Sequence, residues 1–167
     1  MLYILCGIPF SGKTTFARKL AKQKGYTHID LDEVKFKLMG PDTADHLISQ
    51  DDWDKIYKEI YAQIDSALSK NQTVVYDTGN FTRHERGLVS SIAIKRHTTF
   101  KTIFVDTPIA VARQRLAINR KQPDRFNITD EEFESAVQEM ETPSSNEHVF
   151  VYDGAQPIQE WLDINHL

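Results

Sequence analysis

Residues 7–14 have the sequence Gly-Ile-Pro-Phe-Ser-Gly-Lys-Thr, which matches the phosphate-loop pattern G-x-x-x-x-G-K-[ST] in full. An apolar run at residues 2–6 precedes the loop and a segment of helical period at residues 12–24 follows it, as this pattern requires. The glycines permit backbone angles that turn successive N–H groups toward an anion, and the helix N-terminus adds partial positive charge. A nucleoside triphosphate site is therefore predicted. Its expected lining residues are Gly7, Ile8, Pro9, Phe10, Ser11, Gly12, Lys13, Thr14 and Thr15.

Two side chains of this loop carry its expected chemistry. Lys13 is placed to reach the β- and γ-phosphates, and the Thr14 hydroxyl is placed to hold Mg²⁺. Both roles belong to phosphoryl transfer, in which cations neutralise the charge of the moving group. Lys13 is therefore a candidate catalytic residue, and Thr14 is a candidate metal ligand.

Four of the five predicted strands end in an aspartate. The carboxyl ends of parallel strands line the ligand crevice of a sheet, so each aspartate is a candidate for a function. Asp77 ends an apolar strand and has no helix to cap directly after it, which favours contact with Mg²⁺, directly or through water. Asp106 precedes a Thr-Pro helix start and Asp153 precedes a glycine, so structural roles are favoured for these two.

Asp30, the fourth of these aspartates, is followed by a second carboxylate at Asp32, with Leu31 between them. A kinase needs a group that takes the proton of the acceptor hydroxyl, and a carboxylate can perform this step. Asp32 is expected further into the loop, where a substrate can approach, and is the candidate base. The alternative role for Asp32 is to cap the helix that follows, and one residue can serve both purposes.

Three arginines, Arg113, Arg115 and Arg120, follow the fourth predicted strand. Arginines that close over a transferring phosphoryl group neutralise its charge and exclude water. These residues are therefore candidate catalytic residues in a lid at about residues 113–128. Arg113 and Arg120 share a helix face, whereas Arg115 points elsewhere unless the helix unwinds first. The alternative interpretation is a solvated helix with basic residues.

Short apolar runs alternate with segments of helical period along the chain. The predicted strands are residues 2–6, 27–30, 73–77, 99–106 and 148–153. The predicted helices cover residues 12–24, 53–68, a segment from 82, a segment from 107, residues 129–140 and 158–164, with a part-helical stretch at 32–52. The third and fourth runs are continuous and β-branched, which is typical of strands buried on both faces. This order predicts an α/β three-layer sandwich with a five-stranded parallel sheet, a P-loop NTPase of the nucleoside-kinase-like type, in a single domain over residues 1–167.

The composition excludes some classes of protein. The 167 residues include 20 Lys and Arg against 24 Asp and Glu, a formal net charge of −4, which disfavours a protein that holds nucleic acid by broad positive charge. A single cysteine, Cys6, rules out an internal disulfide and fits a reducing compartment. The run at residues 2–6 is too short for a signal peptide or a membrane span, so we expect a cytoplasmic protein that does not attach to a membrane.

The chain resembles a family of small P-loop kinases, which includes the kinase domain of bacteriophage polynucleotide kinase and predicted kinases related to zeta toxins and gluconate kinases. The resemblance runs through nearly the whole chain. It is carried by residues 7–15, by residues 29–35, by the Asp-Thr-Gly-Asn motif at 77–80 and by the arginine-bearing segment after residue 107. It implies ATP as the phosphate donor, with Mg²⁺, and Asp32 as the catalytic base.

The resemblance also implies residues on the acceptor and adenine sides. The residues implied to bind the acceptor are Asp30, Lys35, Thr78, Asn80 and Arg83. Ala155 is implied to border the adenine, where a small residue lets the base approach; an ordinary strand–helix turn is the alternative. The chain departs from the family pattern at two points. Arg115 and Arg120 are five apart instead of four, and Lys35 replaces an arginine that contacts nucleic-acid phosphate in polynucleotide kinase, which weakens bidentate recognition.

These observations predict an ATP-dependent phosphotransferase that moves the γ-phosphoryl group of Mg·ATP to a hydroxyl of a small molecule or of a nucleic-acid end. The alternatives are a polynucleotide 5′-hydroxyl kinase, a zeta-toxin-like metabolite kinase, and a regulatory NTPase switch without an acceptor. The acidic stretch at residues 42–54 is either a solvated face or one side of a site for an acceptor that is not a polyanion and is even cationic. Trp53, Tyr57 and Tyr61 have the spacing of a helix face, which favours the core over a pocket.

Overall fold

A computed structural model describes residues 1–41, 43–122 and 126–167 of the chain. The strands are β1 (Leu2–Cys6), β2 (Thr27–Asp30), β3 (Val74–Asp77), β4 (Phe100–Val105) and β5 (Val149–Tyr152). The α-helices are α1 (Lys13–Lys24), α2 (Leu31–Met39), α3 (Gln50–Ser69), α4 (Arg83–Lys95), α5 (Ile109–Lys121), α6 (Asp130–Glu139) and α7 (Ile158–Ile164). Short 3₁₀ helices, η1 (Asp45–Leu47) and η2 (Ser145–Glu147), precede α3 and β5.

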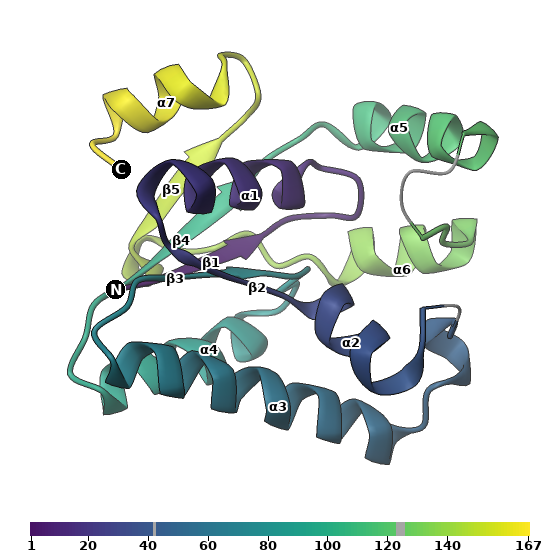
Figure 1. Cartoon of the computed structure of the whole chain (residues 1–167). Coiled ribbons are helices and arrows are strands. Elements are labelled where there is room, and N and C mark those ends of the chain that lie inside the picture. Colours follow the sequence, from purple (N-terminus) through teal and green to yellow (C-terminus); the bar gives the residue numbers. More distant parts are fainter. Residues whose placement is uncertain (42, 123–125) are drawn as a thin grey trace.

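Within the described residues, the strands form one five-stranded parallel sheet in the order β2-β3-β1-β4-β5. The central strand β1 pairs with β3 on one side and with β4 on the other, and Leu2 lies opposite Val74 and Phe100. In Figure 1, α1 and α7 cover one face of the sheet, and α3 and α4 cover the other. The predicted three-layer α/β sandwich with a five-stranded parallel sheet is confirmed.

The central strand β1 is buried on both faces because its side chains alternate between two hydrophobic cores. Leu2 and Ile4 pack into the core under α3 and α4, whereas Tyr3 and Leu5 pack into the core under α1 and α7. Burial on both faces holds the end of β1 in place. The backbone that follows it at Gly7 therefore starts from a fixed position.

A third, smaller core joins this backbone to helices α5 and α6. Its buried members are Ile8, Ala112, Leu116 and Phe133. Ile8 follows Gly7 directly, so the residues after β1 are packed against both helices. Each apolar side chain that is fully removed from water contributes on the order of 2 kcal/mol to this association. These apolar contacts therefore hold the helices of the predicted lid against the predicted phosphate loop.

The start of α2 differs from the expectation for residues 30–32. The helix begins directly after β2, and the Asp30 carboxylate caps it by accepting a hydrogen bond from the Asp32 N–H at 2.9 Å. Asp32 therefore lies in the first turn of α2, and the expectation that it lies further into a loop is wrong. The reason is that Asp30 ends the strand and caps the helix at once, so no loop separates the two elements.

The long helix α3 also begins earlier than expected, at Gln50 instead of Trp53. The Ser49 hydroxyl caps it by accepting from the Asp52 N–H at 3.2 Å, and this cap extends the helix by a turn beyond its apolar stripe. The part-helical stretch expected at residues 32–52 contains α2 and η1. Among the described helices, none is long and apolar enough to cross a membrane.

Candidate active site

The loop between β1 and α1 depends on glycines that take backbone angles other residues rarely adopt. Gly7 has φ 146°, and a Cβ there would lie 2.7 Å from the carbonyl oxygen of Val105. Gly12, which precedes α1, has φ 106°. A side chain at either position would be strained or blocked. The loop and the N-terminus of α1 thus form the geometry that binds phosphate oxygens through backbone N–H groups.

Three polar side chains of this loop, Ser11, Lys13 and Thr14, are at most 9% exposed. The Lys13 ammonium donates to the carbonyl oxygens of Gly7 and Ile8, both at 2.8 Å, so it is held at the loop itself. Within the described part of the chain, the buried Ser11 Oγ has no hydrogen-bond partner. A buried hydroxyl without a partner is costly, and a phosphate oxygen in the loop would supply an acceptor for it.

The strand-end aspartates at the carboxyl edge of the sheet differ in burial. Asp30 and Asp77 are 6% and 2% exposed and lie opposite each other in the pairing of β2 with β3. Asp106 and Asp153 are exposed, and Asp153 accepts a hydrogen bond from the Ala155 N–H at 2.9 Å in a turn. Buried carboxylates are rare unless they are paired or bind a ligand, so Asp30 and Asp77 are the functional candidates.

His28 on β2 lies beside these buried carboxylates, with its Nε2 3.2 Å from Asp77 Oδ2. Burial, together with the negative charges of Asp77 and Asp32, raises the pKa of Asp30 to about 6. Burial lowers the pKa of His28, but the hydrogen bond and charge of Asp77 and the charge of Asp30 outweigh burial and raise that pKa above its usual value. A cation bound at this cluster would therefore offset the negative charge of its carboxylates.

The same cluster fits a divalent cation. Ligand atoms of His28, Asp30 and Asp77 lie within 4.8 Å of one another, and Thr14 lines the same cavity as the two aspartates. Hydroxyl and carboxylate oxygens are the hard donors that Mg²⁺ prefers. The predicted ligands Thr14 and Asp77 thus line one cavity, and His28, which the sequence analysis did not name, lies beside Asp77.

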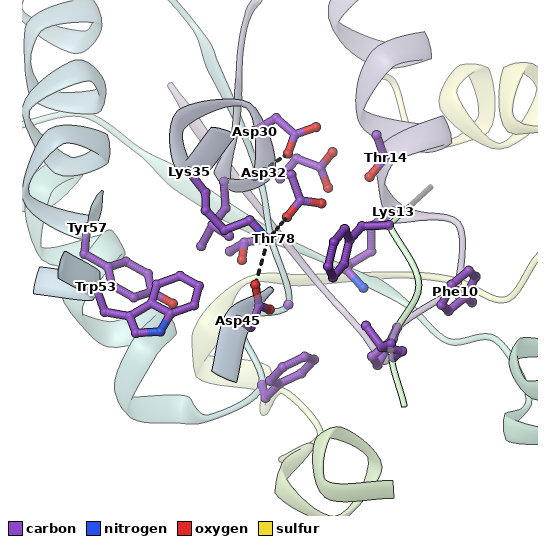
Figure 2. A pocket seen from close by; sticks show the side chains of 17 residues that line it. Phe10, Lys13, Thr14, Asp30, Asp32, Lys35, Asp45, Trp53, Tyr57 and Thr78 are labelled. Carbon is purple, nitrogen blue, oxygen red and sulfur yellow. Dashed lines mark hydrogen bonds and ion pairs between the residues drawn. The ribbon is translucent and has the colours of Figure 1, made fainter. Parts of the chain in front are cut away.

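Asp32 and Lys35 lie on the same side of α2 and share an ion-pair network with η1. The Lys35 ammonium lies 2.7 Å from Asp45 Oδ1 and 3.4 Å from Asp32 Oδ1 (Figure 2). Lys35 is 1% exposed, whereas the side chain of Asp32 is 45% exposed. The buried ammonium thus holds one face of the Asp32 carboxylate, and the rest of that carboxylate is open to a ligand.

These groups line a cavity of about 250 Å³, here called the carboxylate cavity, which Lys13 and Thr14 enter from the opposite side (Figure 2). Its carboxylates are Asp30, Asp32, Asp45 and Asp77. Its aromatic side chains are Phe10, Trp53, Tyr57, Phe81 and Phe126. The structure therefore brings the predicted base, the predicted loop lysine and the predicted metal ligands to one space.

A second cavity, of about 430 Å³, lies on the other side of the phosphate loop and is here called the arginine cavity. Gly12, Thr15 and Arg115 line it, and Phe10 lines both this cavity and the carboxylate cavity. Ala155, which was predicted to border the adenine, is exposed in the turn after β5, and its neighbour Gly154 lines the arginine cavity. A nucleoside placed in this cavity would extend its phosphates along the loop into the carboxylate cavity.

The three lid arginines have different partners. Arg113 pairs with Glu134 at 2.5 Å and Arg120 pairs with Asp130 at 2.9 Å, both acids of α6, so these two arginines share a helix face as expected. Arg115 faces the phosphate loop instead. Its Nη1 donates to the carbonyl oxygens of Phe10 at 3.1 Å and of Ser11 at 2.7 Å. Residues 123–125 of the predicted lid lie outside the described residues.

The three predicted acceptor-binding residues after β3 lie in different surroundings. Thr78 lines the carboxylate cavity. Asn80 is buried and donates from Nδ2 to the Leu5 carbonyl oxygen at 2.7 Å, so it ties this loop to the end of β1. Arg83 is exposed at the start of α4, and its backbone N–H donates to Glu141 at 2.7 Å. Thr78 is therefore the one of these three side chains that lines the carboxylate cavity in the described structure.

The sequence prediction missed the cation that organises this loop, Arg86. Its side chain is 2% exposed, pairs with Glu147 at 2.6 Å and donates to the carbonyl oxygens of Asn80 and Phe81, both at 3.0 Å. Glu147 lies 61 positions away in the chain, so no local pattern indicated the pair. Arg86 fixes the backbone that carries Phe81 to the edge of the carboxylate cavity.

Comparisons with known proteins agree with this fold. A family model described as an AAA domain, AAA_33, matches residues 2–143. L-seryl-tRNA(Sec) kinase of Methanococcus maripaludis is 26% identical across 100% of this chain, which spans 63% of the length of that relative. The Kti12 protein of Chaetomium thermophilum, in complex with ADP-AlF3, has a TM-score of 0.79 at 19% identity and covers 99% of this chain and 97% of its own. A gluconokinase from Sinorhizobium meliloti has a TM-score of 0.65 at 18% identity, and the match covers 96% of this chain and 86% of the gluconokinase chain.

Proposed function

Because the chain belongs to the AAA_33 family of P-loop proteins, we propose that it is a kinase that transfers the γ-phosphoryl group of ATP to a hydroxyl of a small molecule. One observation carries this proposal. Asp32 lines the same cavity as Lys13 and Thr14, so a carboxylate that can take a proton lies opposite the residues expected to hold the phosphates. A hydrolytic switch without an acceptor has no need of a second substrate wall of this kind.

In the proposed reaction the acceptor hydroxyl attacks the γ-phosphorus of ATP. A bond forms between the acceptor oxygen and phosphorus, the bond from phosphorus to the β,γ-bridging oxygen breaks, and ADP leaves. Asp32 accepts the proton of the hydroxyl, and Lys35 holds the Asp32 carboxylate from its other side. Lys13 and the backbone N–H groups of the loop offset the charge on the phosphates, as in other phosphate loops.

Arg115 is the lid arginine that this scheme assigns to the phosphates, since it already contacts the loop at Phe10 and Ser11. Thr14 and Asp77, with Asp30 and His28 close by, would hold the divalent cation. Bound Mg²⁺ supplies positive charge to the phosphate oxygens and orients them for in-line transfer. The third core packs α5 and α6 against Ile8 of the loop, and in this scheme the two helices limit the access of water to the reacting groups.

The charge of the carboxylate cavity favours a small acceptor over a polyanion. Its described lining has four carboxylates, and the cation on the acceptor wall, Lys35, is already paired with Asp32 and Asp45. A nucleic-acid backbone needs cations that are available to its phosphates. This balance disfavours a polynucleotide 5′-hydroxyl kinase.

A second candidate is transfer to the hydroxyl of an aminoacyl group on a tRNA. The observation that favours it is the relative named L-seryl-tRNA(Sec) kinase, which matches along 100% of this chain. In this case the tRNA body would be bound elsewhere than in the carboxylate cavity. The two candidates differ in whether a free small hydroxyl compound or the aminoacyl-tRNA acquires phosphate.

The experiment that tests the proposal is incubation with γ-labelled ATP, Mg²⁺ and a panel of acceptors: amino alcohols, sugars, nucleosides, aminoacyl-tRNA and 5′-hydroxyl oligonucleotides. We expect labelled product from a small hydroxyl compound with the wild-type chain and at least a 100-fold slower reaction with Asp32→Asn. The matched control is Asp106→Asn, an exposed strand-end aspartate. ATP hydrolysis at the same rate with and without every acceptor would contradict the proposal.

A further inference from the structure

A third cavity lies between α3 and α4, next to the carboxylate cavity. It has a volume of about 460 Å³ and is here called the tyrosine pocket. Tyr57, Tyr61 and Tyr76 line it with Thr78, and its charged lining residues are Asp54, Lys58 and Glu85. Tyr57 and Thr78 also line the carboxylate cavity, so the two cavities adjoin at these residues.

The aromatic side chains of α3 form a continuous wall along both cavities. The rings of Trp53 and Tyr57 are 5.9 Å apart between centroids, and those of Tyr57 and Tyr61 are 6.0 Å apart. Trp53 lines the carboxylate cavity, Tyr57 lines both cavities, and Tyr61 lines the tyrosine pocket. Trp53 and Tyr61 pack against the core, as their helical spacing favoured, but all three side chains are only partly buried. A planar or apolar group can therefore lie along this wall.

Negative charge lies at the far end of the same wall. Glu85 lines the tyrosine pocket together with Tyr57 and Tyr61, and burial and the charge of Glu85 both raise the pKa of these two tyrosines. Asp54 adds a second carboxylate, and the exposed Lys58 is the cation of the described lining. Aromatic faces combined with carboxylates are the chemistry that binds organic cations.

We propose that the tyrosine pocket binds a protonated amine of the acceptor, so that the acceptor is a hydroxyl compound with a planar or apolar body and a cationic tail. Its hydroxyl lies at Asp32, its body lies along Trp53 and Tyr57, and its amine lies among Tyr57, Tyr61 and Glu85. This inference rests on the proposed function, because it assigns the acceptor of the same site. The inference assigns binding of the acceptor to the tyrosine pocket, which lies apart from the groups that transfer the phosphoryl group.

The test compares three probes with a hydroxymethyl group at one end of a benzene ring and a different charge at the other end: 4-(aminomethyl)benzyl alcohol, 1,4-benzenedimethanol and 4-(hydroxymethyl)benzoate. Binding to the full chain is measured by calorimetry without ATP, so the result does not depend on phosphoryl transfer. We expect the amine to bind roughly tenfold more tightly than the neutral diol, and the benzoate to bind most weakly. Equal binding of amine and diol, tightest binding of the benzoate, or no binding of any probe would overturn the proposal.

Glu85→Gln is the decisive variant because it removes charge while keeping the fold. Glu85 closes the capping box of α4 with Thr82, and glutamine also serves in a capping box. Glu132→Gln is the matched control, since Glu132 closes the same box with Thr129 at the start of α6. We expect Glu85→Gln to remove the tenfold preference for the amine and Glu132→Gln to retain it. Retention of the preference in Glu85→Gln would overturn the proposal.

A second variant tests the aromatic wall. Tyr61→Leu keeps apolar volume but removes the ring, and we expect it to weaken binding of the amine by roughly fivefold and of the diol by less. Thermal unfolding of each variant verifies that it is folded at the assay temperature. If the probes bind as expected but no acceptor is phosphorylated, the kinase proposal fails and the amine site stands. If transfer occurs without a preference for amines, the amine site fails and the kinase proposal stands.

Discussion

The two sides of the carboxylate cavity differ in how their geometry is fixed. The phosphate-loop side comes from one short segment, and its shape depends on glycine backbone angles and on a strand buried on both faces. The opposite side is assembled from α2, η1, α3 and the loop after β3, and ion pairs such as Lys35 with Asp45 hold it together. The geometry of the phosphate-loop side therefore depends on the backbone, whereas the geometry of the opposite, acceptor side depends on contacts between side chains. Substitutions on the two sides should have different consequences.

The largest effect is expected on the loop side, from Lys13→Ala. Removing the ammonium leaves the charge of the phosphates uncompensated, so we expect phosphoryl transfer to fall by about 10³-fold or more, with weaker ATP binding. Steady-state kinetics and direct titration of ATP measure the two effects. Lys22→Ala, at an exposed position in the last turn of α1, is the control and should leave both unchanged. Equal effects of the two substitutions would remove Lys13 from the site.

Two arginines of the predicted lid differ in their partners, since Arg115 contacts the phosphate loop and Arg113 contacts α6. Arg115→Ala removes a cation that contacts the phosphate loop, and we expect kcat to fall by about 10²-fold. Arg113→Ala removes a cation that pairs with Glu134 on α6, and we expect kcat to change by less than about threefold. The comparison needs kcat for both variants under saturating ATP. A larger loss for Arg113→Ala than for Arg115→Ala would contradict the assignment.

The buried acids predict a pH effect on stability. The pKa of Asp30 is about 6 in the folded chain and 3.8 in the reference state, so the folded state holds its proton more tightly. Stability therefore falls as pH rises from about 4 to 6, and the cost is fully present above pH 6. Asp30→Asn keeps a capping side chain and removes this cost, so we expect a gain on the order of 2 kcal/mol at pH 8.

This effect is measured by thermal unfolding between pH 4 and pH 8 with a chelator present, because a bound cation would favour the ionised carboxylate. Asp106→Asn, at an exposed strand end, is the control and should show no comparable gain. A loss of stability in Asp30→Asn at pH 8 would contradict the electrostatic account of the cluster. A gain that is the same at pH 4 and pH 8 would also contradict it.

The smallest effect is expected on the acceptor side, from Lys35→Met. The substitution leaves the carboxylates of Asp32 and Asp45 without their shared cation, so Asp32 is held less firmly. We expect kcat to fall by about tenfold and the KM for the acceptor to rise, while the KM for ATP is unchanged. Lys35→Arg should restore part of the loss, and Lys37→Met, an exposed neighbour on α2, should have no effect. A change confined to the KM for ATP would contradict this positioning role.

The same contrast explains what could be predicted from the sequence. The phosphate loop, the strand order along the chain and the helix caps at Thr82 and Thr129 depend on neighbouring residues, so their patterns are visible in the sequence. The pairs of Arg86 with Glu147 and of His28 with Asp77 join residues 61 and 49 positions apart, and local patterns do not contain them.

The aromatic wall and the adenine-side loop show two further limits. The spacing of Trp53, Tyr57 and Tyr61 correctly placed them on one helix face, but spacing alone does not tell whether a neighbouring element covers that face. Gly154 lines the arginine cavity, and the sequence does not tell which residue of the turn closed by Asp153 lies there. In both cases the missing information is the packing of another segment.

The central claim is that one cavity joins a phosphate donor to a hydroxyl acceptor, with Asp32 as the base. Its most direct test is the Asp32→Asn variant in the acceptor-panel assay, with ATP affinity measured on the same preparation. The account predicts unchanged ATP affinity and a loss of transfer of at least about 100-fold. Transfer at the wild-type rate in this variant would contradict the account.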